Sequence, residues 1–175
     1  EVWLGLRQEA ERVAAKEPIL SKVLSEFVLE RDSLPDALGW RLASRLGRSS
    51  VPEQDLRELI RDAFLEEPGL LETICLDLQA VRERDPACSD YLSPFLYFKG
   101  FQALVGYRAA NYLWRNDRRE LAQYLQGLIA AVYTVDIHPA AKIGCGILLD
   151  HATGFVAGET TVIEDDVSIL HEVTL

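Results

Sequence analysis

Written in units of six, one segment near the end of the chain reads Ile137-His-Pro-Ala-Ala-Lys, Ile143-Gly-Cys-Gly-Ile-Leu, Leu149-Asp-His-Ala-Thr-Gly. After a phase slip of two residues near 155–159, the pattern resumes as Ile163-Glu-Asp-Asp-Val-Ser and Ile169-Leu-His-Glu-Val-Thr. An aliphatic residue at every sixth position is typical of a parallel β-helix, in which each unit forms one short strand and one corner. Glycine and short polar residues suit the corners, because the backbone turns sharply there. The sequence therefore predicts the first coils of a β-helix over residues 135–175.

The first 134 residues follow a different pattern. Apolar residues recur at intervals of three and four, as in Trp3, Leu6 and Ala10, which is the period of an amphipathic α-helix. Ser33 with Asp36 three positions later resembles a helix N-cap. The predicted helices cover residues 2–15, 19–30, 34–46, 53–66, 69–84, 94–115 and 118–131. The predicted fold class is therefore α+β, with an all-α domain over residues 1–134 followed by an incomplete β-helical domain over residues 135–175.

The charge balance limits the kinds of partner. The chain has 18 Lys and Arg against 28 Asp and Glu, a formal net charge of −10, which argues against nucleic acid or an anionic membrane surface. No apolar run approaches the roughly 20 residues that cross a bilayer. Cys75, Cys88 and Cys145 form no C-x-x-C pair, so neither a disulfide framework nor a metal site is predicted. We expect a cytoplasmic protein with reduced thiols.

The three histidines, at positions 138, 151 and 171, all lie in the repeat region. His151 follows Asp150 and lies fifteen residues after Asp136, close to the about 18 residues of three units, so we expect His151 and Asp136 on adjacent coils. A neutral imidazole held by a carboxylate can deprotonate an alcohol, because the carboxylate fixes its tautomer and stabilises the imidazolium. The spacing leaves two interpretations open, a catalytic base and a satisfied surface histidine.

The other candidate groups are assigned structural roles. His138 precedes Pro139 at a corner, where a packing or capping role is expected. His171 lies on a later repeat and is left outside the site. No cysteine or serine is paired with a base, so a covalent acyl-enzyme is not predicted.

Several stretches together resemble the serine O-acetyltransferase family of hexapeptide-repeat acyltransferases, and the resemblance runs over essentially the whole chain. Such enzymes join a helical domain to a left-handed parallel β-helix, which agrees with the two patterns above. In the repeat region the matching stretches are Asp136-Ile-His-Pro-Ala-Ala-Lys-Ile-Gly, Leu149-Asp-His-Ala-Thr-Gly, Gly158-Glu-Thr and Val167-Ser-Ile-Leu-His-Glu-Val-Thr-Leu. Upstream they are Asp77-Leu-Gln-Ala-Val-Arg-Glu-Arg-Asp-Pro-Ala, Lys99-Gly-Phe-Gln-Ala-Leu and Tyr107-Arg.

The resemblance implies the reaction and the residues that perform it. Acetyl-CoA, as co-substrate and not as a permanently bound cofactor, would donate its acetyl group to the hydroxyl of L-serine and give O-acetyl-L-serine for cysteine biosynthesis. The family's catalytic base matches His151, and its orienting carboxylate matches Asp136. The aspartates that hold the polar groups of serine match Asp85 and Asp150. The charges of these two aspartates are consistent with that role, because a serine ammonium needs carboxylate partners near the reacting hydroxyl.

The resemblance also implies partners and marks what the chain lacks. Relatives continue past Leu175 with a glycine-rich loop, an Arg-His pair, further coils and a tail, so most acetyl-CoA contacts are expected beyond this chain. The family forms trimers or dimers of trimers, binds L-cysteine as a feedback inhibitor and docks its tail into O-acetylserine sulfhydrylase. Two alternatives stay open. One is a catalytically incomplete fragment that acts as an oligomerisation module. The other, a sugar or antibiotic acyltransferase, is disfavoured by the long helical domain and the Arg84-Asp85-Pro86-Ala87 loop.

Overall fold

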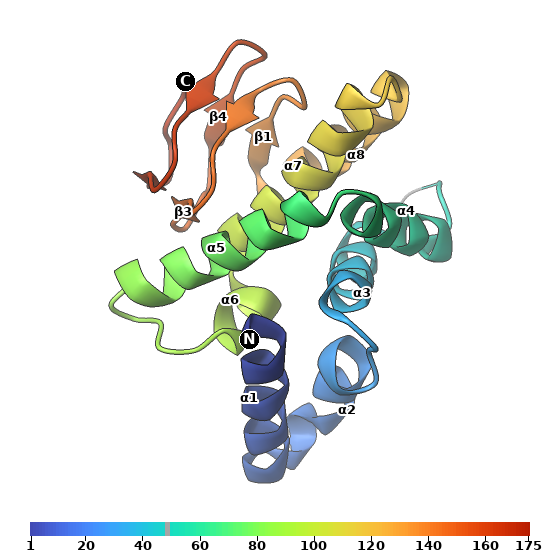
Figure 1. Cartoon of the computed structure of the whole chain (residues 1–175), viewed down its shortest axis with the longest axis vertical. Coiled ribbons are helices and arrows are strands. Elements are labelled where there is room, and N and C mark those ends of the chain that lie inside the picture. The colour runs from blue at the N-terminus through green and yellow to red at the C-terminus, as the bar shows by residue number, and fades with distance from the viewer. Residues whose placement is uncertain (48–49) are drawn as a thin grey trace.

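A computed structural model describes residues 1–47 and 50–175 of the chain. The helices lie between Val2 and Tyr133, and short strands follow from Val135 onward (Figure 1). The helices are α1 (Val2–Lys16), η1 (Pro18–Leu20), α2 (Ser21–Leu24), η2 (Ser25–Leu29), α3 (Leu34–Leu46), α4 (Glu53–Glu66), α5 (Pro68–Arg84), α6 (Leu92–Tyr97), α7 (Lys99–Arg115) and α8 (Arg119–Tyr133). The strands are β1 (Val135–Ile137), β2 (Lys142–Ile143), β3 (Leu148–Leu149), β4 (Phe155–Ala157), β5 (Val162–Ile163) and β6 (Ser168–Ile169). The predicted fold class is confirmed.

Most predicted helices are present, and the start of α3 shows the expected cap. The backbone N–H of Asp36 donates to Ser33 Oγ at 3.4 Å, and Pro35 occupies the first turn, where its missing N–H costs nothing. The segment predicted as one helix over 19–30 is less regular. It winds as a 3₁₀ turn, one α-helical turn and then a π-helical turn.

The single helix predicted over residues 94–115 is wrong, because the chain breaks at Phe98. Phe98 has extended backbone angles, φ −85° and ψ 107°, and separates α6 from α7. The break allows α7 to begin directly against strand β3. A Cβ atom added at Gly100 would lie 1.9 Å from the carbonyl oxygen of Leu149, so only glycine fits between the helix and the strand. This contact between distant segments is absent from the local helical pattern.

The strands form the coils of a parallel β-helix. They pair in parallel as β1 with β4, β2 with β5 and β3 with β6, and the partners differ by 20 in residue number, as Asp136 with Val156 and Leu149 with Ile169. The start of the next turn returns to a spacing of 18, since Val156 bridges Thr174. The extra two residues of the first coil therefore lie in the corner 150–154, between β3 and β4, and not near 155–159 as the sequence pattern predicted.

One hydrophobic core runs through the helices and into the coils. Ile137, Ile163 and Ile169 are buried inside the β-helix, in the same contiguous cluster as Tyr107 and Tyr133 of the helices. Because the two parts share this core, the division into a helical domain over residues 1–134 and a β-helical domain over residues 135–175 stays a prediction. None of the helices in residues 1–47 and 50–175 is both long and apolar enough to span a membrane.

Candidate active site

A pocket of about 310 Å³ opens where three segments meet. These are the end of α5, the junction of α6 with α7, and β3 with the corner that follows it. Its walls include Val81, Phe98 and Leu148, and a few polar side chains converge on it. Apolar walls around a small number of polar groups are typical of small-molecule sites. In the described part of the chain, no group of three or more His, Cys, Asp and Glu side chains is placed to hold a metal ion.

Three of the four residues predicted from the sequence line this pocket: Asp85, Asp150 and His151. Asp85 directly follows α5, and one of its carboxylate oxygens accepts a hydrogen bond from the N–H of Ala87 at 2.8 Å. Asp150 follows β3, where its own N–H donates to the carbonyl of Ile169 one coil away at 2.8 Å. Each aspartate therefore lies at the end of a regular element, and two segments 65 residues apart bring them to one pocket.

His151 occupies an unusual backbone conformation in the corner 150–154. Its φ is 55° and that of Ala152 is 60°, both in the left-handed region, which costs a non-glycine residue about 1–2 kcal/mol. The His151 side chain is 76% exposed, and its Nε2 lies 3.8 Å from Asp150 Oδ1. The ring of His171, for which the sequence predicts no role in the site, lies edge-on with its centroid 6.1 Å from that of His151. The imidazole is thus open to solvent and loosely held.

Asp136, the fourth predicted residue, does not line the pocket. It lies on β1 beside Val156 and accepts a hydrogen bond from Gln126 Nε2 at 2.7 Å. Within residues 1–47 and 50–175, no hydrogen bond or ion pair joins Asp136 to His151. The first coil takes 20 residues and not the expected 18, so the residue paired with Asp136 is Val156, and His151 lies in the extra corner before it. The role of Asp136 stays a prediction.

His138 has the structural role that its position before Pro139 predicts. Its Nδ1 accepts a hydrogen bond from the N–H of Ala140 at 3.1 Å, and its ring packs edge-on against Trp114. It caps the turn between β1 and β2 and anchors that turn to α7.

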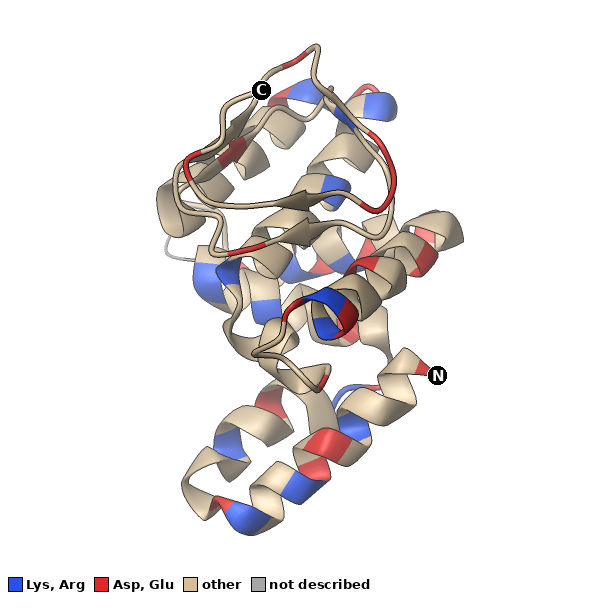
Figure 2. Ribbon diagram, turned by 90° about the vertical axis from the view of Figure 1, so that its left-hand side faces the viewer, with Lys and Arg blue, Asp and Glu red and all other residues tan. Residues whose placement is uncertain are grey.

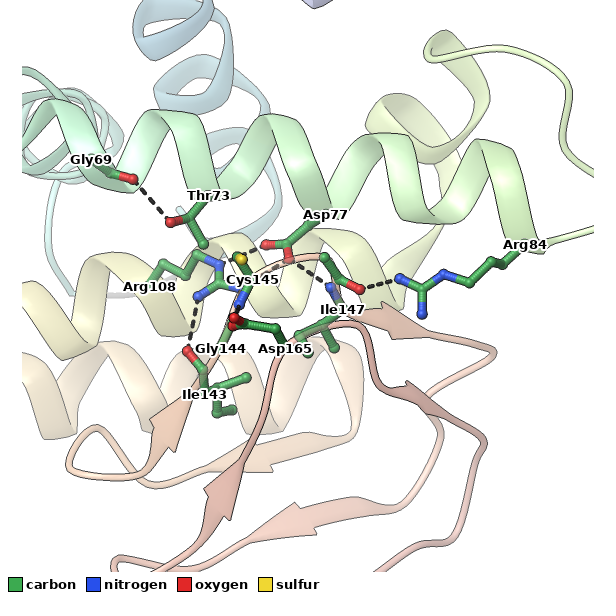
Figure 3. A network of polar contacts seen from close by, with 11 residues as sticks. Gly69, Thr73, Asp77, Arg84, Arg108, Ile143, Gly144, Cys145, Ile147 and Asp165 are labelled. Atoms are coloured by element: carbon green, nitrogen blue, oxygen red, sulfur yellow. Dashed lines mark hydrogen bonds and ion pairs between the residues drawn. The ribbon is translucent and has the colours of Figure 1, made fainter.

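Sequence reasoning missed a buried ion pair that fixes the coils to the helices (Figure 3). Arg108 Nε donates to Asp77 Oδ2 at 2.6 Å, and the Arg108 guanidinium also reaches the carbonyl of Gly144 at 2.8 Å. Asp77 Oδ1 accepts from the N–H of Ile147 at 2.9 Å, just before β3. Burial raises the pKa of Asp77, and the charge and hydrogen bonds of Arg108 act against that rise. Both residues lie in stretches that resemble the family, but nothing in the sequence near either residue marks them as partners.

Arg84 provides a second link beside the pocket. Its guanidinium donates to the carbonyl of Asp166 at 2.7 Å, to Ser168 Oγ at 3.1 Å and to the carbonyl of Gly146. Arg84 thereby ties the last residue of α5 to both coils. Because Asp85 is the next residue, this link also sets the position of its backbone relative to β3.

Acidic groups dominate the charge around the β-helix. Figure 2 shows Asp and Glu at several corners of the coils, and Lys142 is the only Lys or Arg from residue 135 onward. Among the described residues that line the pocket, Lys99 is the single Lys or Arg, against the two carboxylates of Asp85 and Asp150. A pocket with this excess of negative charge favours a ligand that carries an ammonium group.

Comparison with known proteins places the chain in a family. A family model described as the N-terminal region of serine acetyltransferase matches residues 2–105. The serine acetyltransferase of Haemophilus influenzae is 48% identical over 175 residues, which is 100% of this chain and 66% of that relative. The chain therefore spans slightly less than two thirds of the length of that relative.

Two solved structures have the same fold over nearly the whole chain. A serine acetyltransferase in complex with CoA is 48% identical, with a TM-score of 0.97 over 99% of this chain and 74% of that one. A serine acetyltransferase in complex with cysteine is also 48% identical, with a TM-score of 0.96 over 99% of this chain and 72% of that one. On the matched family region and on these identities, the chain belongs to the serine acetyltransferase family.

Proposed function

We propose that the protein transfers the acetyl group of acetyl-CoA to the hydroxyl of L-serine, giving O-acetyl-L-serine and CoA. The observation that carries this proposal is the convergence of Asp85, Asp150 and His151 on one pocket, in a chain of the serine acetyltransferase family. Two carboxylates suit the serine ammonium, and an imidazole beside them suits its hydroxyl. The relative solved with CoA supports acetyl-CoA as the co-substrate.

In the proposed reaction, His151 accepts the hydroxyl proton as the serine oxygen bonds to the thioester carbonyl carbon. The carbon–sulfur bond then breaks, and the sulfur of CoA leaves and takes up the proton. General-base help of this kind contributes about 10²–10⁴ in rate. The rest of the acceleration comes from holding the two substrates in line, which is the role that we assign to Asp85 and Asp150.

Asp136 is proposed to orient the His151 imidazole and to stabilise its protonated form. In one chain Asp136 is exposed and bound to Gln126, away from the pocket. A second copy of the chain that packs on the outer face of β1 would supply Asp136 to the His151 of its neighbour. This pairing agrees with the trimer, or dimer of trimers, that we propose as the assembly.

The activity is tested by following CoA thiol release and O-acetylserine formation with the purified protein, acetyl-CoA and L-serine. His151→Asn is expected to lower kcat by about 10²–10⁴ and to change the serine KM much less. His138→Asn is the matched control, because asparagine keeps the acceptor for Ala140 and His138 lies outside the pocket. Equal losses in both variants, or no acetylserine from the wild type, would refute the proposal.

Regulation and location are proposed by the same reasoning. L-Cysteine has the same ammonium and carboxylate as serine, and a relative has been solved with cysteine bound. We therefore propose that cysteine competes with serine for this pocket in a cytoplasmic enzyme. O-Acetylserine sulfhydrylase is the proposed protein partner of the full-length enzyme.

A second candidate function is an oligomerisation module without activity of its own. It is favoured by large apolar side chains on the surface, with Ile19 88% exposed, Val162 66% and Leu170 57%. Light scattering together with the acetylation assay distinguishes the two, since the module would form trimers or hexamers and release no thiol.

A further inference from the structure

Lys99 is a residue to which the resemblance assigns no role, and it touches the corner that carries His151. It is the first residue of α7, and it lines the pocket together with Asp85 and Asp150. Its ammonium donates to Thr153 Oγ1, and it also donates to Thr134 Oγ1 at 3.3 Å. One side chain thus joins the start of α7, the turn between α8 and β1, and the corner 150–154.

The corner needs such support because its backbone is strained. His151 and Ala152 have φ values of 55° and 60° and are followed by Gly154 at 73°. Residues in the left-handed region persist where the surroundings hold them there. Within the corner, the N–H of Thr153 closes a tight turn by donating to the carbonyl of His151 at 2.8 Å.

Three contacts hold the corner from outside at Thr153 and Gly154. Glu172 N–H donates to the carbonyl of Thr153 at 2.7 Å, and Gly154 N–H donates to the carbonyl of Thr134 at 2.9 Å. Lys99 supplies the third, and in the described parts of the chain it is the only residue whose side chain reaches residues 150–154 by a hydrogen bond from outside them. Lys99 and the Gly154–Thr134 bond clamp the corner to the same turn, at Thr134.

The neighbour of Lys99 in the sequence strengthens the same contact. Gly100 lets α7 approach the carbonyl of Leu149 so closely that no Cβ fits. Leu149 is the last residue of β3, directly before Asp150 and His151. The first two residues of α7 therefore contact the corner at both of its ends. Gly100 packs against Leu149 before it, and the Lys99 ammonium binds Thr153 near its end.

We propose that Lys99 is a positioning residue, which pins Thr153 to Thr134 and so fixes the direction in which the corner presents His151 to the pocket. This inference rests on the proposed function, in which His151 is the base. An ammonium has three donors, of which two are directed to neutral hydroxyls. Direct contact of Lys99 with the serine carboxylate is the competing role.

A double-mutant cycle separates the two roles. Lys99→Met removes the ammonium and keeps the aliphatic stem, and Thr153→Val removes the acceptor at nearly constant volume. If Lys99 acts through Thr153, each single variant lowers kcat roughly 10- to 100-fold with little change in the serine KM. The double variant is then no slower than the slower single variant, because both changes break the same bond. Lys99→Arg, which keeps donors for both hydroxyls, restores part of kcat.

Lys142→Met is the matched control, since Lys142 is an exposed lysine of the same β-helix outside the pocket. It is expected to leave kcat unchanged. A raised serine KM with unchanged kcat in Lys99→Met, together with a silent Thr153→Val, would show direct substrate binding and overturn the proposal. So would additive losses in the double variant.

Hydrogen exchange tests the same inference without any activity. The amide of Gly154, which donates to Thr134, is expected to exchange faster in both Lys99→Met and Thr153→Val than in the wild type, while amides of α4 stay unchanged. Unchanged exchange at residues 151–155 in both folded variants would overturn the positioning role. Because this measurement needs no acetyl transfer, a failure of the proposed enzyme function and a failure of the Lys99 inference give different results.

Discussion

The Arg108 guanidinium and the Asp77 carboxylate form a buried ion pair at 2.6 Å, with side chains only 4% and 0% exposed. The pair does more than join α5 to α7, since Asp77 also accepts the N–H of Ile147 and Arg108 also binds the carbonyl of Gly144. These two backbone groups lie in the turn between β2 and β3. The ion pair therefore sets the position of β3, and with it the pocket residues Asp150 and His151.

Breaking this pair is expected to destabilise the whole protein. Arg108→Met leaves an uncompensated buried carboxylate, which typically costs about 3–5 kcal/mol of the free energy of unfolding. Urea unfolding followed by circular dichroism measures the loss. Arg119→Met is the control, because Arg119 pairs with Asp117 at 3.8 Å on the exposed surface. A loss in Arg108→Met no larger than in the control would contradict the assigned role.

Two glycines in helices are expected to respond in opposite directions to the same change. Gly100→Ala forces a Cβ against the carbonyl of Leu149, so we expect a loss of about 1–3 kcal/mol and a displaced β3. Gly127→Ala, in α8, meets no atom within 4 Å and is expected to stabilise the helix by about 0.5–1 kcal/mol. Thermal unfolding measures the melting temperature of each variant relative to the wild type. Equal changes in melting temperature for the two variants would refute the packing interpretation.

Mixing inactive variants tests where the Asp136 carboxylate acts. If Asp136 of one subunit serves His151 of its neighbour, Asp136→Asn and His151→Asn oligomers that are dissociated and reassembled together regain part of the wild-type kcat. If both groups act within one chain, the mixture stays inactive. Asp136→Asn and His151→Asn oligomers that are each dissociated and reassembled alone are the control, because neither can form a site that holds both groups.

Tyr107 makes the stability of the protein fall at alkaline pH. Its hydroxyl donates to the carbonyl of Ala141 at 2.6 Å, and burial raises the pKa of Tyr107 to about 12 from an ordinary value of 10.0. Because the folded pKa lies above the unfolded one, the contribution is fully present below pH 10 and is lost as the pH rises toward 12. The expected slope is about 1 kcal/mol per pH unit. The difference between the urea midpoints of unfolding at pH 9 and pH 11 is therefore expected to be smaller in Tyr107→Phe than in the wild type.

The sequence predicted much of the fold because the information was local. Apolar residues at intervals of three and four predict a helix, and an aliphatic residue at every sixth position predicts a β-helix. Both patterns can be recognised from residues that are close in the sequence. The cap at Ser33 was predicted for the same reason, since its partner Asp36 is three residues away. The position of His151 relative to Asp136 made it a candidate base, whereas the roles of Asp85 and Asp150 came from the family resemblance, and all three remain to be tested by mutation.

The tertiary structure decided what depends on contacts between distant segments. The break at Phe98 brings Gly100 against Leu149, a contact between distant segments, and the corner 150–154 takes two extra residues that a strict period of six does not place. For that reason the sequence alone put Asp136 beside His151, whereas the register puts it beside Val156.

The sequence by itself thus determined the type of each element and the chemical groups at hand. Packing decided which of these groups are in contact. Asp77 pairs with Arg108, and Lys99 binds Thr153, only because separate elements are brought together. The physical reason is that hydrophobic periodicity specifies which face of an element is buried, while the partner across that face is selected by the close packing of the whole core.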